Sequence, residues 1–149
     1  MRAVVQRVSS ARVRVAGRTV GEIADGILAL ISVGVSDDVG DARSMAEKLA
    51  TLRIFGDDRG MMNRSLLETG GAVLLVSQFT LHGDVRRGRR PSFVAAAKEK
   101  AARELYELTG ATLEALGAPV AYGEFGAHME VELVNSGPVT ILVDTKRAF

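Results

Sequence analysis

Two short polar segments, each beside an apolar run, hold the residues that could do chemistry in this chain. Residues 72–76 are all apolar and lead into Ser77-Gln78-Phe79-Thr80-Leu81. Backbone N–H groups at the end of a strand have no ladder partner, so they can bind an ester carbonyl or the oxyanion that forms when the ester is attacked. Alternation along a continuing strand would place Gln78 and Thr80 on one face. The alternative is that this segment is the ordinary polar end of a strand.

The second segment is Asn135-Ser136-Gly137-Pro138, set between two apolar runs. Proline has no N–H and cannot lie inside a central strand, so we predict that the chain turns or exposes its backbone between a strand at 129–135 and another at 139–143. Only about 5–6% of X-Pro bonds in folded proteins are cis. The sequence by itself therefore predicts a plain turn.

The usual hydrolytic catalysts are missing. His82 and His128 are the only histidines, neither lies in a metal-ligand pattern, and no carboxylate cluster has ligand spacing. There is no G-x-S-x-G elbow around Ser77 and no cysteine anywhere. We expect no metal and no cofactor, so a hydrolase built on this chain has to work without the common nucleophile and base.

One loop concentrates positive charge in an otherwise neutral chain. The protein has 19 Lys and Arg against 18 Asp and Glu, a net charge of +1, so any nucleic-acid site must be a local patch. Arg86, Arg87, Arg89 and Arg90 lie within five residues. Such a run is often a solvated loop, but it is also suited to binding phosphates without reading bases.

Composition predicts one soluble domain spanning residues 1–149. With 47% hydrophobic residues, a chain of this length can bury a core of its own. No uncharged apolar stretch approaches the roughly 20 residues of a membrane helix, and the N-terminus, with charges at Arg2 and Arg7, has no apolar segment of the kind a signal peptide contains. The absence of cysteine fits a reducing compartment. We expect a cytoplasmic protein.

Hydrophobic periodicity predicts the order β-β-β-α-β-α-β-β-β. Two helices cannot cover both faces of so many strands, so we expect two mostly antiparallel sheets packed on each other with the helices on one side, an α/β fold of three layers, α/β/β. Gly110 could break the second helix. The predicted strands of this order are 2–15, 19–23, 26–35, 72–76, 120–122, 129–135 and 139–143, and the predicted helices are 42–52 and 95–116. Residues 53–55 are a candidate for one more short strand, outside this order.

The combination of these segments resembles the D-aminoacyl-tRNA deacylases. Besides SQFTL and NSGPVT, the chain begins MRAVVQRV, has RRPSF at 89–93, and has FGAHM at 125–129, so the similarity spans essentially all 149 residues. The resemblance implies the same three-layer fold in a homodimer without a cofactor or membrane attachment. It also implies hydrolysis of the ester between a D-amino acid and the 3′ end of tRNA, and of glycyl-tRNA mischarged on tRNA-Ala.

The resemblance implies roles for the first segment. Ser77, Gln78, Phe79 and Thr80 would line the active site, where the Thr80 hydroxyl has been considered a nucleophile. In this family, backbone N–H groups and the 2′-hydroxyl of the terminal adenosine of the tRNA are considered the catalytic groups instead. The four arginines of the loop would then bind the acceptor end of the tRNA.

It implies roles for the second segment as well. Gly137-Pro138 would form a cis peptide whose carbonyls cross a dimer interface and leave no room in the partner's pocket for an L side chain. Arg7 would steady this loop, with Asn135 beside it. Ser136 stands where many members have an acidic residue, so its contribution to the loop is an open question.

Two other functions fit the same residues. One is a noncatalytic RNA-binding dimer on this fold, which the shortage of candidate bases favours. The other is a related editing deacylase whose Gly-Pro bond is trans and whose larger pocket admits L-alanyl-tRNA. Turnover of aminoacyl-tRNA separates the first from an enzyme, and the substrate's chirality separates the second.

Overall fold

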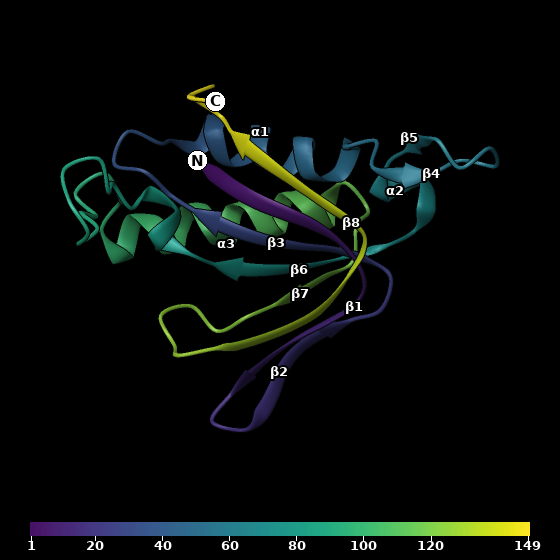
Figure 1. The fold of residues 1–149 in the computed structure, drawn as a ribbon, viewed down its shortest axis with the longest axis horizontal. Helices are drawn as coiled ribbons and strands as arrows, with labels where there is room; N and C mark the ends of the chain where they lie inside the picture. Colours follow the sequence, from purple (N-terminus) through teal and green to yellow (C-terminus); the bar gives the residue numbers. More distant parts are fainter.

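The computed structural model describes all of residues 1–149 as one bent sheet with helices on one side (Figure 1). The strand order in the sheet is β2-β1-β3-β6-β7, and β8 pairs with β1. A small hairpin, β4-β5, stands apart from it. The elements are β1 (Arg2–Val15), β2 (Arg18–Ile23), β3 (Gly26–Ser32), α1 (Val39–Thr51), β4 (Phe55–Gly56), β5 (Met62–Arg64), α2 (Leu66–Thr69), β6 (Ala72–Ser77), the 3₁₀ helix η1 (Phe79–His82), α3 (Glu99–Ala115), β7 (Val120–Tyr122) and β8 (Glu130–Asp144).

Strand β1 is the axis of the sheet. Its first half, Arg2 to Val8, pairs antiparallel with β3, and its second half, from Ala11, pairs antiparallel with β2. Strand β8 runs antiparallel along both halves. The remaining pairs, β3 with β6 and β6 with β7, are parallel. The sheet therefore bends along β1, and Figure 1 shows β2 and the far half of β1 turned away from β3 and β6.

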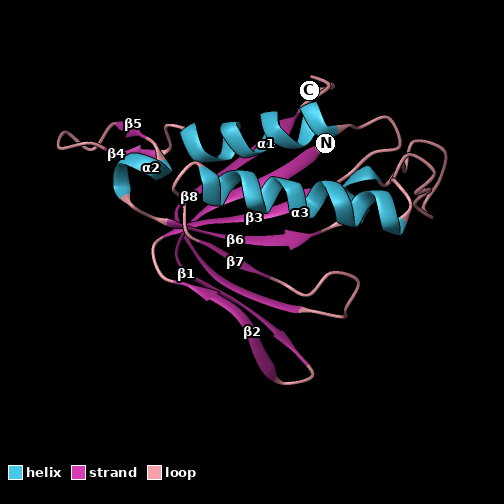
Figure 2. Cartoon of the chain, turned by 180° about the vertical axis from the view of Figure 1, so that it is seen from behind, coloured by secondary structure: helices cyan, strands magenta, loops and turns pink.

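Two hydrophobic clusters hold the layers together. The larger lies between the sheet and the helices α1 and α3, which cover the same face (Figure 2). The smaller fills the bend and joins Val13 of β1 and Ile23 of β2 to Leu74 of β6. The predicted α/β/β class is confirmed. Its two strand layers are the two halves of one bent sheet rather than two separate sheets.

The predicted long helices are present and their boundaries have local causes. Helix α1 begins with a capping box, in which the Asp38 side chain accepts from Asp41 N–H and the Asp41 side chain accepts from Asp38 N–H. The prediction that Gly110 breaks the second helix was wrong, because α3 passes straight through it. A Cβ at Gly110 would lie 2.5 Å from the hydroxyl oxygen of Tyr122, so the glycine is there for close packing.

The C-terminal strands differ from the prediction. The two expected strands are one strand, β8, which lies at an edge of the sheet. Gln6 pairs with Thr140 and Val8 pairs with Asn135, so residues 136–139 bulge out of the ladder. A bulge on an edge strand is where a proline is tolerated. The expected exposure of the backbone is therefore present without a break between two strands.

The segment between α1 and β6 holds more structure than its sequence predicted. The expected strand at 53–55 is shifted to β4, which pairs with β5. The helix α2 was not predicted at all. It is only four residues long, too short for hydrophobic periodicity to reveal, and begins with its own capping box between Ser65 and Glu68.

Candidate active site

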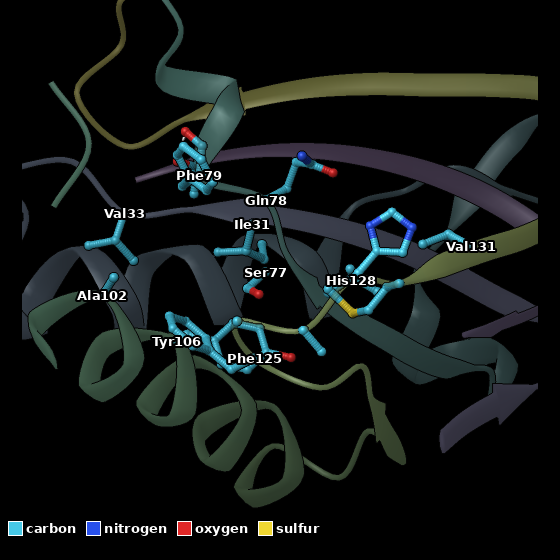
Figure 3. Close-up of a pocket in the computed structure, with 15 residues that line it drawn as sticks. Ile31, Val33, Ser77, Gln78, Phe79, Ala102, Tyr106, Phe125, His128 and Val131 are labelled. Carbon is cyan, nitrogen blue, oxygen red and sulfur yellow. Dashed lines mark hydrogen bonds between the residues drawn. The ribbon is translucent and has the colours of Figure 1, made fainter. Parts of the chain in front are cut away.

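A cavity of about 280 Å³ opens where β3 and β6 end, between these strands, α3 and the segment before β8. Figure 3 shows Ser77 and Gln78 at its wall, with Tyr106 and Phe125 on one side and His128 on another. Most of its lining is apolar, as is typical of a site for a small molecule or the end of a larger one. The lining residues are Ile31, Ser32, Val33, Val76, Ser77, Gln78, Phe79, Ala102, Tyr106, Phe125, Gly126, Ala127, His128, Met129 and Val131.

The alternation considered for residues 77–81 does not occur, because the strand ends as predicted. Strand β6 ends at Ser77, and Phe79 begins the 3₁₀ helix η1. Gln78 and Thr80 are neighbours because of this turn, and the Gln78 side-chain amide donates a hydrogen bond to the Thr80 hydroxyl. The first N–H groups of a helix have no partner within it, so those of Phe79 and Thr80 are free to bind a ligand.

Three contacts hold the η1 turn on the sheet. The Gln78 N–H donates to the Ile31 carbonyl at 2.7 Å. The Ser32 hydroxyl donates to the Phe79 carbonyl at 3.1 Å. From β1, the Arg2 guanidinium donates to the Leu81 carbonyl at 3.1 Å. The Phe79 and Leu81 carbonyls are thus directed toward β3 and β1, and the Thr80 N–H, which shares a peptide group with the Phe79 carbonyl, points the opposite way.

The side chains of the turn are more exposed than its backbone. Phe79 is 56% exposed and packs edge to face on Phe93, with ring centroids 5.1 Å apart. Thr80 is exposed and does not line the cavity, whereas Ser77, Gln78 and Phe79 do. The structure therefore brings three of the four predicted catalytic residues to the cavity and leaves the Thr80 hydroxyl outside it.

Two ionisable side chains line the cavity. Burial raises the pKa of Tyr106, and its hydroxyl donates to the Leu75 carbonyl at 2.8 Å. A phenol that is held protonated cannot serve as a base at neutral pH. His128 is exposed at the cavity wall. The other histidine, His82, is buried behind the turn, where desolvation lowers its pKa.

The Gly-Pro bulge is exposed and supported from two sides. The bond between Gly137 and Pro138 is cis, and both residues are exposed. Arg7 donates to the Ser136 carbonyl at 3.0 Å and to the Ile54 carbonyl at 2.6 Å. Beneath the bulge, the Asn135 side chain accepts from the Val139 N–H and donates to the Thr140 hydroxyl. Arg7 and Asn135 thus both contact the bulge.

The bulge lies far from the cavity of its own chain. Arg2 contacts the η1 turn and Arg7 contacts the bulge. These two arginines are five positions apart on β1, which is about 17 Å at the rise of a strand. The structure does not bring Gly137 and Pro138 together with Ser77, Gln78 and Phe79 within one chain.

The arginine loop contains its own counter-charge. Arg86 forms an ion pair with Asp84, with Nη2 to Oδ2 at 2.6 Å, and its Nε donates to the other carboxylate oxygen. This pairing lowers the pKa of Asp84 and raises that of Arg86. Arg87, Arg89 and Arg90 are exposed and form no ion pair. The loop thus presents three uncompensated charges rather than four.

Sequence reasoning missed Ser32 and Phe93. Ser32 is the polar end of an otherwise apolar buried strand, and this position beside the equally polar end of β6 was a signal that both strands end at one site. Phe93 was noted only within the RRPSF segment. Nothing in its local sequence indicates a contact with Phe79, because the two residues meet through the fold of the intervening loop.

Two further features of the structure bear on ligands and membranes. No three His, Asp or Glu side chains come close enough together to share a metal ion. None of the helices has the length and apolar character needed to span a bilayer.

The sequence matches one protein family along almost all of its length. The family model described as D-Tyr-tRNA(Tyr) deacylase matches residues 4–144. A D-aminoacyl-tRNA deacylase of Symbiobacterium thermophilum is 57% identical over 149 residues, covering 100% of this chain and 99% of that protein. The D-aminoacyl-tRNA deacylase of Deinococcus radiodurans is 56% identical over 144 residues, covering 97% of this chain and 99% of that protein.

Solved structures with similar folds have more varied names. A c-Myc DNA Unwinding Element Binding Protein superposes with a TM-score of 0.93 at 35% identity, covering 97% of this chain and 99% of that chain. A probable eukaryotic D-amino acid tRNA deacylase superposes with a TM-score of 0.81 over 95% of this chain and 97% of that one. At 19% identity, the second likeness is one of fold alone.

Proposed function

Because this chain belongs to the D-Tyr-tRNA(Tyr) deacylase family, we propose that it hydrolyses the ester bond of D-aminoacyl-tRNA and releases the D-amino acid and tRNA. The observation that supports this most directly is the match at 57% identity over the full length of a named D-aminoacyl-tRNA deacylase. The cavity at Ser77-Gln78-Phe79 is the site that we assign to the aminoacyl end.

The free backbone N–H groups supply the chemistry in this proposal. The ester carbonyl binds at the N–H groups of Phe79 and Thr80, which stabilise the oxyanion that forms when water attacks. Thr80 itself does not line the cavity, but its N–H belongs to the same peptide group as the carbonyl of Phe79, which does, so we place this donor at the rim of the cavity. An aminoacyl ester is an activated group, so positioning and oxyanion stabilisation are enough to accelerate its hydrolysis. Water adds to the carbonyl carbon, and the bond to the ribose oxygen then breaks as that oxygen takes up a proton.

No side-chain base is required. The Thr80 hydroxyl lies outside the cavity and has no basic partner that could activate it as a nucleophile. The phenol of Tyr106 is held protonated. We assign the proton transfers to water and to the 2′-hydroxyl of the terminal ribose, and we assign no catalytic role to His128. Replacing His128 by Gln should accordingly leave kcat within about threefold of the parent value, well short of a general base's usual contribution.

Chirality is controlled by a second chain in this proposal. The exposed bulge at Gly137-Pro138 cannot reach the cavity of its own chain, so it acts on the cavity of a partner in a homodimer. The backbone of such a bulge excludes an L side chain by steric clash, and it makes no contact that depends on which D side chain is present. Glycine has no side chain to exclude, so glycyl-tRNA, including that mischarged on tRNA-Ala, is also a substrate.

Hydrolysis of matched D-tyrosyl-, L-tyrosyl- and glycyl-tRNA by the purified protein tests this proposal, with a chelator present throughout. Cleavage of the D-tyrosyl and glycyl substrates, with the L-tyrosyl substrate spared, is the expected result. Cleavage of all three would contradict the exclusion of L side chains. Stable D-tyrosyl-tRNA in the presence of folded protein would contradict the deacylase activity itself.

A noncatalytic nucleic-acid-binding dimer is the second candidate. The absence of a conventional base in the cavity favours it, and one relative of similar structure is named for DNA binding. Such a protein would bind tRNA through its exposed arginines and leave every aminoacyl ester intact. The editing deacylase with a trans Gly-Pro bond differs in cleaving L-alanyl-tRNA.

A further inference from the structure

We propose that Ser32 and His82 form a positioning pair that sets the direction of the Thr80 N–H in the active site, with His82 in its Nδ1–H form. This inference rests on the proposed function, since it assigns the pair a part in binding the ester carbonyl. Neither residue reaches into the reaction itself. Both act through the backbone of the η1 turn.

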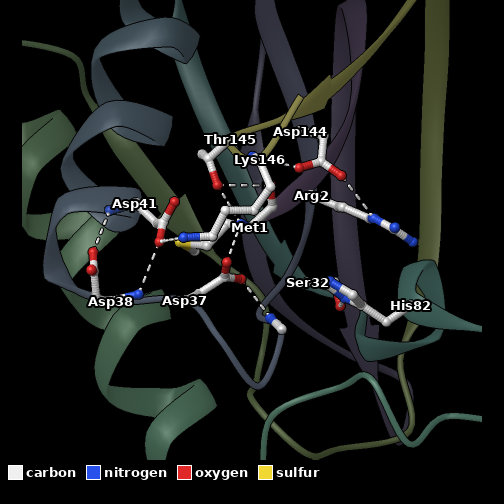
Figure 4. Close-up of polar contacts among 11 residues, drawn as sticks. Met1, Arg2, Ser32, Asp37, Asp38, Asp41, His82, Asp144, Thr145 and Lys146 are labelled. Atoms are coloured by element: carbon white, nitrogen blue, oxygen red, sulfur yellow. Dashed lines mark hydrogen bonds and ion pairs between the residues drawn. The ribbon is translucent and has the colours of Figure 1, made fainter. Parts of the chain in front are cut away.

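The pair lies directly behind the turn. Ser32 is 1% exposed and His82 is 8% exposed. The Ser32 hydroxyl oxygen lies 3.1 Å from the Phe79 carbonyl oxygen and 2.5 Å from Nδ1 of His82. Figure 4 shows the two side chains against each other, with His82 on the η1 helix and Ser32 at the end of β3. A single hydroxyl therefore contacts both ends of the turn.

The contacts of Ser32 determine where the protons lie. A carbonyl oxygen only accepts, so the Phe79 contact is a hydrogen bond only when the single hydroxyl proton of Ser32 is donated to it. Ser32 can then only accept from His82, which requires a proton on Nδ1. In the opposite tautomer His82 would compete with the Phe79 carbonyl for the Ser32 proton. The arrangement that satisfies both contacts is the chain His82 Nδ1–H to Ser32 to Phe79.

This chain has a consequence for the active site because the peptide group is planar. The Phe79 carbonyl and the Thr80 N–H belong to one trans peptide and point in opposite directions. Ser32 holds the carbonyl toward the interior, so it directs the Thr80 N–H outward. An oxyanion donor must point at the position where charge develops, and small errors in direction reduce its effect. Ser32 fixes that direction and His82 fixes the rotation of the Ser32 hydroxyl.

The surroundings of His82 keep the ring in place. A Cβ on Gly34 would lie 2.9 Å from Nε2 of His82, so the ring packs closely on the backbone there. The charged groups that act on the ring are Arg2, Asp37, Asp144 and the Met1 amino group. Arg2 is bound to Asp144, and Asp37 is bound to the amino group of Met1 (Figure 4). These charges are paired with each other, which leaves Ser32 as the hydrogen-bond partner of the ring.

The proton position can be measured without any assay of activity. The chain has only two histidines, so ring ¹⁵N spectra of the parent and of His128→Gln assign both. At a pH where His82 is neutral, we expect its proton on Nδ1. In Ser32→Ala we expect a shift toward the Nε2–H form, which is free of the Ser32 contact. A His82 proton on Nε2 in the parent protein would overturn the proposal.

Single-turnover and steady-state hydrolysis of D-tyrosyl-tRNA then test the positioning role. Ser32→Ala should lower kcat by about tenfold to a hundredfold and leave KM within about twofold, because the affected donor acts in the transition state. Ser65→Ala removes another buried serine from a capping box and serves as the matched control. An unchanged kcat in Ser32→Ala, with the Ser65→Ala control also unchanged, would overturn the positioning role.

Two amide variants separate positioning from mere packing. The side-chain NH₂ of His82→Asn lies where Nδ1–H lies and can donate to Ser32, whereas that of His82→Gln reaches the place of Nε2. We expect His82→Asn to retain kcat within about threefold and His82→Gln to resemble Ser32→Ala. Equal losses in both would overturn the role of His82. If the parent protein does not cleave D-tyrosyl-tRNA, the proposed function fails and the catalytic role fails with it, while the ring spectrum still decides the hydrogen bond.

Discussion

Arg7 Nε lies 3.0 Å from the carbonyl oxygen of Ser136, and the same guanidinium donates to the Ile54 carbonyl at 2.6 Å. One side chain in the middle of β1 thus joins the Gly-Pro bulge to the segment that leads into β4. Arginine can do this because its rigid guanidinium presents several donors in one plane. Lysine, a single ammonium group on a flexible stem, cannot reproduce both contacts at once.

Replacing Arg7 should therefore relax the rejection of L substrates. In Arg7→Ala and Arg7→Lys we expect the ratio of D-tyrosyl- to L-tyrosyl-tRNA hydrolysis to fall by about tenfold, equivalent to about 1.4 kcal/mol of discrimination. The rate of glycyl-tRNA hydrolysis should change least, because glycine has no side chain for the bulge to exclude. Arg43→Ala, which removes an exposed arginine from α1, is the charge-matched control. If both Arg7 variants kept the parent protein's ratio of D-tyrosyl- to L-tyrosyl-tRNA hydrolysis, the bulge would need no support from this residue.

Replacing Thr80 should have a small effect. Thr80→Ala removes a hydroxyl that lies outside the cavity and keeps the backbone N–H, so kcat should stay within about threefold of the parent value. Loss of a covalent nucleophile would instead lower kcat by several orders of magnitude. Single-turnover rates with D-tyrosyl-tRNA distinguish these outcomes. Trapping of an aminoacylated enzyme in the parent protein would also argue for the nucleophile.

The arginine loop should contribute to tRNA binding through three charges. Replacing Arg87, Arg89 and Arg90 together by Ala should weaken binding and reduce the slope of log K against log salt by about 2 to 3, if each binds one phosphate. Arg86→Ala should change the slope less, because Asp84 already neutralises that residue. Filter binding or fluorescence anisotropy over a salt series measures both slopes. Equal effects of Arg86→Ala and of any one of the other single variants would contradict the internal pairing.

Stability should fall in mild acid because of His82. Burial lowers its pKa below the ordinary value of 6.5, so the unfolded chain binds a proton more readily than the folded one. As the pH falls below 6.5, toward the lowered pKa, the free energy of unfolding should decrease by at most about 1.4 kcal/mol per pH unit. The pKa of Asp41 is lowered to about 2, so its own contribution is lost only in stronger acid.

Thermal unfolding at pH values from 7.5 to 5 provides the measurement. His82→Asn cannot take up the proton, so its melting temperature should decrease less over this range than that of the parent protein. His128→Gln removes the exposed histidine and should follow the parent curve. Identical curves for the parent and His82→Asn would mean that the buried imidazole does not govern this part of the pH dependence.

Local patterns predicted the long elements because their information lies within the segment itself. Helices α1 and α3 repeat apolar residues at helical spacing, and β3 is a continuous apolar run, buried along nearly all of its length. The η1 turn was missed for the opposite reason. Its conformation depends on Ser32, which is 47 positions away from Phe79 in the sequence. No window of local sequence contains that contact.

The candidate site was predicted in part for a similar reason. The segment 77–80 and the Gly-Pro pair stand out because their residue types interrupt apolar runs. The pairing of Arg86 with Asp84 was available from sequence proximity, because Asp84 lies two positions before the first of the four arginines at 86–90. The contact between Phe79 and Phe93 required the path of the loop. The support by Arg7 came from family resemblance, since a strand arginine has no local signature of its partner.

The bend of the sheet along β1 has a consequence for how the protein unfolds. Val5 of β1 belongs to the cluster under the helices, and Val13 of the same strand belongs to the cluster inside the bend. Neither cluster can lose β1 without exposing the other, and β8 spans both halves alongside it. The two cores should therefore melt as a single cooperative unit. In native-state hydrogen exchange, slow amides from both halves of β1 should open together with one common free energy.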